Sequence, residues 1–478
     1  MYILRHICIL LMISSCAVSK AGVSGPHINI KTDFGAVGNG ITNDHDAFVL
    51  AAQYINQRKG NCTLIIPKGT YKVGKQVKIP GEKFRTGIHL LDLKNCTNVK
   101  IICQGQIRYK DGLYYGSFNP KTSQAHHTNR KEKFRNRKYL ADVGSAISLR
   151  NCENIELDGI DLDGNNRNII LGGDYVEKGI QARYSGITMY NVRNVKVMNC
   201  KTNYFGQDGF IIKNYVKRNP TQVDENILVQ NCTSDYNGRQ GMSVTGCIGL
   251  TIVSSSFSHT GRGGNSSGPG AGIDFEGEGQ INKNITLTNC QIIDNRGVGL
   301  LADSGNTSDV EVDNCFIWGT TKWSVWMRKP RVQIKNSTIY GAVVHAYSSP
   351  NNADATKFIN CSFRDTIPSY GKFLVQVDGP KNVQYINCDF HSKTKRLFYT
   401  VSKATAQKDY ILFESCDFYP NLKAANQAKR IGVWGGVRYK NNTFHYNKEK
   451  SSVPKDNIRK MRTIKNLGGN SSKYNAIE

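Results

Sequence analysis

Two carboxylic acids, Asp274 and Glu276, form the pair in this sequence that is best suited to chemistry. They lie in the stretch Ala271-Gly-Ile-Asp-Phe-Glu276, where apolar residues alternate with others as they do in a half-buried β-strand. Residues two apart on a strand point to the same side, with Cα atoms roughly 6.6 Å apart. Two neighbouring carboxyls disfavour each other's ionisation, so one pKa rises while the other group stays ionised. The pair therefore suits general acid–base catalysis.

Glycosidases use such a division between an acid and a base to cleave a glycosidic bond. Inverting hydrolases hold their carboxyls about 6.5–9.5 Å apart, and retaining ones about 5–5.5 Å. Flexible side chains at Asp274 and Glu276 reach either range, so the stereochemistry stays open. The alternative interpretation is a solvated pair on an exposed strand.

Similar glycine-led strands precede and follow the carboxylate strand, so the outward side chains of all of them can be aligned. Two residues after each glycine come Thr188, Ile211, Ser243, Asp274 and Leu301. Four residues after it come Tyr190, Lys213, Thr245, Glu276 and Asp303, and the next unit adds Trp326 and Arg328. If these strands stack about 4.8 Å apart, the two rows form one outward surface of rings, cations, hydroxyls and acids. That mixture predicts a sugar-binding groove with Tyr190, Lys213, Arg239, Gln240, Ser243, Asp303, Trp326 and Arg328 as substrate-binding residues.

The dipeptide Asn-Cys recurs at the ends of short strands, from Asn95-Cys96 to Asn387-Cys388. Units of roughly 22–28 residues that contain short strands and Asn/Gly turns predict the coils of a parallel β-helix. They lack the leucine pattern of leucine-rich repeats and are too short for propeller blades. One residue type at one place in each unit predicts a ladder of small buried side chains, and the alternative is that some pairs of the fourteen cysteines form disulfides.

The N-terminal part carries a resemblance to a known superfamily. A glycine-rich turn in residues 33–48 leads to a possible N-cap at 42–44 and a helix-like run at 47–55, followed by a strand, a turn and a strand at 64–73. This opening resembles the N-terminal cap of the rhamnogalacturonase and epimerase-like pectate lyase superfamily, which includes polygalacturonases. The resemblance implies an all-β, right-handed parallel β-helix with an N-terminal helical cap, and it leaves the reaction open.

Polygalacturonases carry Asn-Thr-Asp, Asp-Asp and Gly-His-Gly at the starts of successive strands. The corresponding positions here are Tyr184-Ser-Gly, Gln207-Asp208 and Arg239-Gln240-Gly241, so only Asp208 matches. Polygalacturonase chemistry at that location is therefore not supported. Asp208 is a further catalytic candidate by this resemblance, or else it stabilises a turn.

Composition bears on the compartment and the partner. Residues 1–22 combine Arg5, an apolar run and small residues, which predicts a secretory signal, and the stretch ending at Cys16 resembles a lipobox. No later stretch is apolar enough to span a membrane. The net charge is +26, with 63 Lys and Arg against 37 Asp and Glu, which favours an acidic (uronic or sulfated) polysaccharide as partner. Nucleic acid is disfavoured as a partner by the predicted export and by the absence of a helical or zinc-ligand motif that would read bases.

The predicted organisation is one β-helix over residues 23–446, with insertions at 110–140 and 261–271 and a basic tail at 447–478. We expect a secreted or lipid-anchored hydrolase of an acidic polysaccharide. One alternative is a lyase in which Asp274, Glu276 and Asp303 hold Ca²⁺ and Lys213, Arg239 or Arg328 acts as base or clamp, with Tyr190 nearby. Another is a β-helix that binds glycans without cutting them. His126 and His127 are interpreted as exposed loop residues rather than metal ligands.

Overall fold

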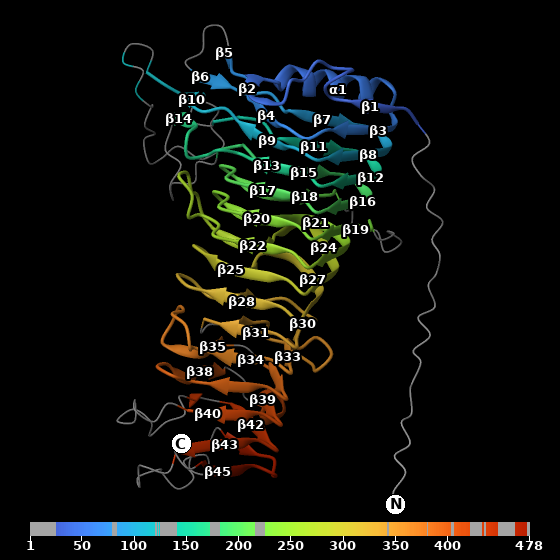
Figure 1. Cartoon of the computed structure of the whole chain (residues 1–478). Coiled ribbons are helices and arrows are strands. Elements are labelled where there is room, and N and C mark those ends of the chain that lie inside the picture. The colour runs from blue at the N-terminus through green and yellow to red at the C-terminus, as the bar shows by residue number, and fades with distance from the viewer. Residues whose placement is uncertain are drawn as a thin grey trace, which may run out of the picture.

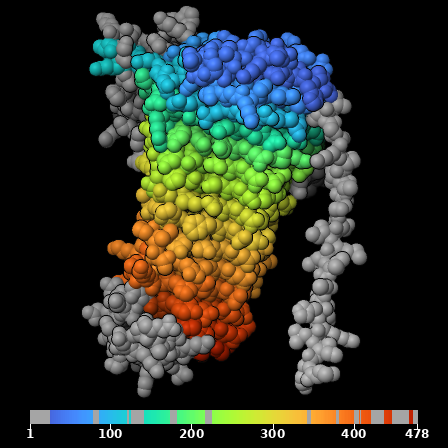
Figure 2. Space-filling model, viewed as in Figure 1, coloured from blue at the N-terminus to red at the C-terminus, as the bar shows by residue number. Residues whose placement is uncertain are grey.

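The protein is a long stack of coils with a helix at its N-terminal end, and the stack continues to the C-terminal strands (Figure 1). The computed structural model describes residues 25–78, 84–119, 122, 124, 141–172, 182–215, 225–341, 344–379, 381–402, 406–420, 433–434, 436–447 and 464–475. In the space-filling view the described residues follow one another in bands along an elongated body (Figure 2). Among the described helices, none is long and apolar enough to cross a membrane.

Each complete coil contributes one strand to each of three parallel sheets. The first sheet contains β7 (Leu91–Lys94), β11 (Ile147–Arg150), β15 (Ile187–Tyr190), β18 (Asp208–Lys213), the first part of β21 (Gln240–Val253), β23 (Ala271–Phe275), β26 (Leu300–Ala302), β29 (Val325–Met327) and β32 (Val344–Ala346). A three-stranded parallel sheet of β35 (Phe373–Gly379), β38 (Arg396–Ser402) and β41 (Val433–Trp434) lies in the C-terminal coils.

The second sheet is continuous with the first, because β21 runs from one into the other without a break. It contains β1 (His27–Asn29), β3 (Gly60–Ile66), β8 (Thr97–Cys103), β12 (Glu153–Asp158), β16 (Arg193–Met198), β19 (Ile227–Gln230), the rest of β21, β24 (Gly277–Thr288), β27 (Gly305–Asp313), β30 (Val332–Lys335), β33 (Lys357–Ile359), β36 (Gln384–Ile386), β39 (Ile411–Glu414), β42 (Val437–Lys440) and β44 (Ile464–Asn466).

The third sheet closes each coil. It contains β2 (Asn39–Asn43), β4 (Thr70–Val73), β9 (Gln106–Tyr109), β13 (Asp161–Asp163), β17 (Lys201–Asn203), β20 (Thr233–Asp235), β22 (Ser256–Ser258), β25 (Gln291–Asn295), β28 (Phe316–Gly319), β31 (Thr338–Tyr340), β34 (Ser362–Arg364), β37 (Asp389–His391), β40 (Asp417–Tyr419), β43 (Thr443–Asn447) and β45 (Ser471–Asn475). A small four-stranded sheet of β5 (Val77–Lys78), β6 (Phe84–Thr86), β10 (Tyr114–Ser117) and β14 (Ile170–Gly172) lies outside the coils. The predicted β-helix is confirmed.

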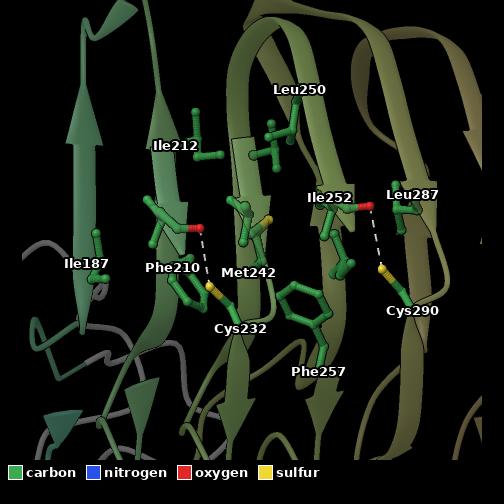
Figure 3. Packing of buried hydrophobic residues seen from close by; sticks show 14 of the residues in the cluster. Ile187, Phe210, Ile212, Cys232, Met242, Leu250, Ile252, Phe257, Leu287 and Cys290 are labelled. Carbon is green, nitrogen blue, oxygen red and sulfur yellow. Dashed lines mark hydrogen bonds between the residues drawn. The ribbon is translucent and has the colours of Figure 1, made fainter. Parts of the chain in front are cut away.

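Alternate side chains of each strand point into the coil and fill it with apolar atoms. In the first sheet the inward row is the one that the glycine alignment predicted, and all five side chains are fully buried: Ile187, Phe210, Met242, Ile273 and Leu300. Figure 3 shows this core between the sheets, with Phe257 of the third sheet and Leu250 of the second meeting the first-sheet residues. Because each coil buries its side chains against the next, the stack has one continuous core.

The recurring asparagines make the sharp corners of the coils. Asn289 and Asn314 have φ of 56° and 50°, the left-handed conformation that asparagine tolerates better than most residues. The side-chain amide of Asn314 donates to Oδ1 of Asn289 one coil away, at 2.7 Å. Asn387 donates to Asn360 in the same way, at 2.8 Å. The corner therefore selects asparagine both for its backbone and for a hydrogen-bonded ladder.

The cysteine that follows each corner asparagine is buried and free. All twelve cysteines in the described residues are unbridged, so the predicted ladder is confirmed in that part of the chain. The thiol of Cys290 donates to the carbonyl of Ile252 at 3.6 Å (Figure 3). Serine replaces cysteine in two coils, where the hydroxyls of Ser255 and Ser337 accept from the N–H of Cys232 and of Cys315, each at 3.0 Å. The position after the corner residue is therefore occupied by a small side chain that also forms hydrogen bonds, either cysteine or serine.

Helix α1 (His45–Gln57) covers the N-terminal end of the stack, as predicted. Its fully buried residues Phe48, Ala51 and Ile55 face the first coil. Asp44 occupies the N-cap position, but its carboxylate accepts from the N–H groups of Val37 and Gly38, at 2.7 and 3.0 Å, rather than from the helix. The acid therefore fixes the glycine-rich turn against the helix.

The C-terminal boundary predicted at residue 446 is too early. Strands β44 and β45 pair in parallel with β42 and β43, so residues 464–475 add a coil where a tail was expected. The segment is polar in sequence, so hydrophobic periodicity did not indicate its strands. The predicted signal at 1–22 with Cys16, and the histidines at 126 and 127, lie outside the described residues.

Candidate active site

The strands that carry the predicted site residues stack in the expected register. Ser243 of β21 pairs with Asp274 of β23, Asp274 pairs with Leu301 of β26, and Leu301 pairs with Trp326 of β29. The register shifts between Ile212 and Lys213, so Lys213 lies opposite Gly246 instead of Thr245. Successive coils therefore place Ser243, Asp274, Leu301 and Trp326 side by side on the outer surface of the first sheet.

The expectation that this row forms an open groove is wrong at its centre. The exposed fractions of Asp274 and Ser243 are 1% and 2%. Two side chains from the start of β21 extend over the row, because Arg239 and Gln240 reach toward the acids of the next coil. The insertion at 261–271 is anchored at the turn that precedes these two side chains, since the N–H of Ser267 donates to the carbonyl of Gly238 at 3.0 Å.

Arg239 is the centre of a compact charged cluster. Nη1 lies 3.2 Å from Oδ2 of Asp208, and Nη2 lies 3.3 Å from Oε2 of Glu276. Nε2 of Gln240 donates to Oδ2 of Asp274 at 2.9 Å. The cluster brings together Asp208, Arg239, Gln240, Asp274 and Glu276, which are residues of three successive coils. The three catalytic candidates of the sequence are therefore neighbours in space.

Two of these carboxyls are shifted toward the protonated form. Burial raises the pKa of Asp208 to about 7, although Arg239 opposes the shift. Burial also raises the pKa of Asp274 well above its ordinary value, and the charge of Glu276 raises it further. Arg239 and the hydrogen bond from Gln240 act in the opposite direction on Asp274. The cluster therefore contains acids that hold protons near neutral pH.

Glu276 is the acid of the cluster that solvent reaches. Its side chain is 26% exposed, whereas that of Asp208 is 1% exposed and that of Arg239 is 13% exposed. Its side chain forms an ion pair with Arg239 and lies at the surface beside Asp274, whose pKa is raised. The pair therefore consists of one buried and one partly exposed carboxyl, and its division into acid and base stays a prediction.

Of the predicted substrate-binding residues, Arg239 and Gln240 contact the acids themselves, so they position catalytic candidates. Tyr190 is half-buried, and burial raises its pKa, with a further contribution from the charge of Asp208. Lys213 is partly exposed and places its ammonium 5.8 Å from the centroid of the Tyr215 ring. These side chains lie toward the N-terminal coils from the acids.

Toward the C-terminal coils, Asp303 and Arg328 are exposed, and Trp326 packs on Trp323. Lys329 is a residue that the sequence analysis missed. It is buried, and its Nζ donates to the carbonyls of Asp303 and Gly305 at 3.2 and 2.8 Å. It holds the backbone beside Asp303, and nothing in the sequence distinguishes it from the many exposed lysines.

The alternative calcium site at Asp274, Glu276 and Asp303 is wrong. Within the described ranges no three side chains of His, Cys, Asp or Glu are grouped so that they could hold a metal ion. The reason is visible in the cluster, because the guanidinium of Arg239 already lies against Glu276 and supplies the positive charge. Asp274 is directed to Gln240 instead.

Comparison with known proteins agrees with this architecture. The family model described as a right handed beta helix region matches residues 123–317. The fold is a right-handed parallel β-helix. A search of curated proteins finds no relative of the sequence.

Among solved structures, the β-helix resembles the A-module of an Azotobacter vinelandii mannuronan C-5 epimerase, with 13% identity, a TM-score of 0.50, and coverage of 95% of this chain and 98% of that one. It also resembles the N-terminal fragment of gene product 12 of bacteriophage Phi29, with 14% identity, a TM-score of 0.56, and coverage of 93% and 70%. An endo-xylogalacturonan hydrolase from Aspergillus tubingensis has 12% identity, a TM-score of 0.32, and coverage of 93% and 94%. The neighbours thus include carbohydrate-active enzymes and phage proteins, and these identities establish the fold alone.

Proposed function

We propose that this protein is an exported enzyme that hydrolyses an acidic polysaccharide, with Asp274 and Glu276 as its acid–base pair. The observation that supports this most is the contrast within the pair. Asp274 is buried and its pKa is raised, whereas Glu276 is partly exposed and ion-paired with Arg239. A hydrolase of glycosidic bonds needs one carboxyl that gives a proton and one that takes a proton.

In this proposal Glu276 is the carboxyl that meets the substrate, and Asp274 holds the proton behind it. Glu276 raises the pKa of Asp274, and in this proposal the proton passes from Asp274 by way of Glu276 to the substrate. The proton goes to the glycosidic oxygen as its bond to the anomeric carbon breaks. Water then supplies hydroxide to that carbon and returns a proton to the pair. Arg239 stabilises the negative charge left on the acids during the step.

Charge supports an acidic substrate. The chain has a net charge of +26, and cations stand on both sides of the acids, Lys213 toward the N-terminal coils and Arg328 toward the C-terminal coils. An anionic chain would be attracted to such a protein before any specific contact forms. Export is the part of the proposal that depends on residues 1–22, and removal of those residues should leave the protein inside the cell.

The test is to incubate the protein with polygalacturonate, alginate, chondroitin sulfate and a carrageenan, each with and without chelator. Hydrolysis predicts new reducing ends without the absorbance of an unsaturated uronate, and no effect of the chelator. Unsaturated products would instead show elimination, and the proposal of hydrolysis would fail. In that case Lys213 and Tyr190 become the candidate bases.

A second candidate function is glycan binding without cleavage. It is favoured by the burial of Asp208 and Asp274, each 1% exposed, because a substrate must displace the covering side chains to reach them. Retention of the protein by an acidic polysaccharide in affinity electrophoresis, with no reducing ends formed over long incubation, would select this function.

A further inference from the structure

We propose that Trp323 and Trp326, with the apolar residues beneath them, form a platform that stacks on an uncharged face of a sugar ring next to the acids. This tryptophan platform comprises Ala271, Val298, Leu301, Trp323 and Trp326. The inference rests on the proposed function, and it adds which kind of sugar unit lies on the C-terminal side of Glu276.

The platform is an apolar cluster outside the coil, separate from the continuous core. Val298 and Leu301 are 6% and 7% exposed, and the two tryptophans that pack on them are only partly buried. The indole rings have centroids 3.9 Å apart and cross at 67°. Two rings that support each other edge to face lose little conformational freedom when a ligand stacks on them.

Strand register places the platform beside the acids. Leu301 pairs with Asp274, and Trp326 pairs with Leu301, so Trp326 lies two coils from Asp274 on the same outer surface. Two coils correspond to about 10 Å along the axis. A polysaccharide that presents a glycosidic bond to Glu276 and continues toward the C-terminal coils therefore passes over the indoles.

The two sides of the acids differ in chemistry. On the N-terminal side the outer surface presents Tyr190 and Lys213, which suit an anionic unit. On the C-terminal side it presents the apolar platform, beside which the exposed Asp303 and Arg328 carry opposite charges. This asymmetry assigns a substrate class: a chain in which a charged unit alternates with an uncharged one, with the uncharged unit over the indoles.

The experiment measures binding in a Glu276→Gln background, so that cleavage does not consume the probe. The probes are size-defined oligosaccharides of hyaluronan and chondroitin, in which a uronate alternates with an uncharged unit, and of polygalacturonate, in which every unit is charged. Affinity is measured by calorimetry and by quenching of tryptophan fluorescence. The alternating probes should bind at least about tenfold more tightly than polygalacturonate. Trp326→Ala and Trp323→Ala should each weaken that binding about tenfold, which corresponds to about 1.4 kcal/mol.

Two variants keep the result interpretable. Trp326→Phe retains a ring and should keep most of the affinity, whereas Trp318→Ala on the third sheet should not change it, because Trp318 donates to the carbonyl of Pro368 away from the platform. Unchanged binding in Trp323→Ala and Trp326→Ala would overturn the platform. Platform-dependent binding without any cleavage by the wild type would overturn the hydrolase alone, and no binding of any probe would overturn both.

Discussion

Replacement of Asp208 by asparagine should remove a dependence of stability on pH that the wild type carries. Asp208 is buried, and its pKa is raised to about 7 in the folded protein from an ordinary value of 3.8. A raised pKa means that the folded state prefers the protonated acid. The stabilising contribution of that proton is complete below about pH 4 and is lost as the pH rises toward 7, because the unfolded chain gives up its proton first.

The magnitude follows from the two pKa values. Integrated between pH 5 and pH 8, a shift from 3.8 to about 7 costs the wild type about 3 kcal/mol of unfolding free energy. Asparagine has the shape of the protonated acid and does not titrate. Relative to Asp208→Asn, the wild type should therefore become about 3 kcal/mol less stable between these two pH values.

The assay is urea-induced unfolding followed by tryptophan fluorescence at pH 5 and at pH 8, with wild type and variant compared at each pH. Asp303→Asn serves as the matched control, because Asp303 is an exposed acid on the same surface, and it should show a difference that stays constant with pH. If the difference between wild type and Asp208→Asn is the same at both pH values, Asp208 does not hold a proton in the folded protein, and the electrostatic description of the cluster is refuted.

Three further predictions concern the elements around the site. Arg239→Met should lower the free energy of unfolding by about 3–5 kcal/mol at pH 8, because it leaves Asp208 and Glu276 without their cation. The control Arg328→Met, at an exposed site, should change it by less than about 0.5 kcal/mol. Equal effects of the two variants in urea titrations would contradict the assigned ion pairs. Asn314→Ala should lower the free energy of unfolding by about 1–3 kcal/mol, because alanine disfavours the left-handed backbone and loses the hydrogen bond to Asn289. Asn314→Gly should recover part of this loss in thermal unfolding. If it recovers none, the backbone conformation is not the cause. Cys290→Ser should lower the free energy of unfolding by less than about 1.5 kcal/mol, because serine already occupies the equivalent position at 255 and 337. Cys290→Leu should lower it by about 1–3 kcal/mol, because the larger side chain overpacks the core. Comparable losses of stability in the two variants would argue against a hydrogen-bonded ladder.

The fold could be predicted from the sequence because the sequence repeats. Asparagine and cysteine at each corner, together with apolar alternation in Ile187, Phe210 and Met242, define the coils and their register before any coordinates are known. The same register placed Asp274 beside Ser243 and Leu301. The physical reason is that neighbouring coils repeat the same pairing, so one aligned glycine fixes a whole row.

The repeat pattern did not predict that side chains cover the acids. Arg239 directly precedes β21 and Gln240 is its first residue, and the turn of the chain at Gly238 directs both side chains over Asp274 and Glu276. Side-chain direction in a turn depends on its backbone, which a pattern of residue types does not specify. For the same reason Lys329 was not distinguished from other lysines, because its burial depends on the carbonyls of Asp303 and Gly305.

The central claim is that Glu276 is the substrate-facing carboxyl of a catalytic pair, and the rate of reducing-end formation tests it most directly. The rate should be measured for wild type, Glu276→Gln and Glu311→Gln, a half-exposed acid on the second sheet, on the polysaccharide that the wild type cleaves. We predict that Glu276→Gln lowers the rate by at least about a hundredfold, as expected for loss of an acid–base group, while Glu311→Gln stays within a few fold of the wild type. A folded Glu276→Gln protein that cleaves at the wild-type rate would contradict the account.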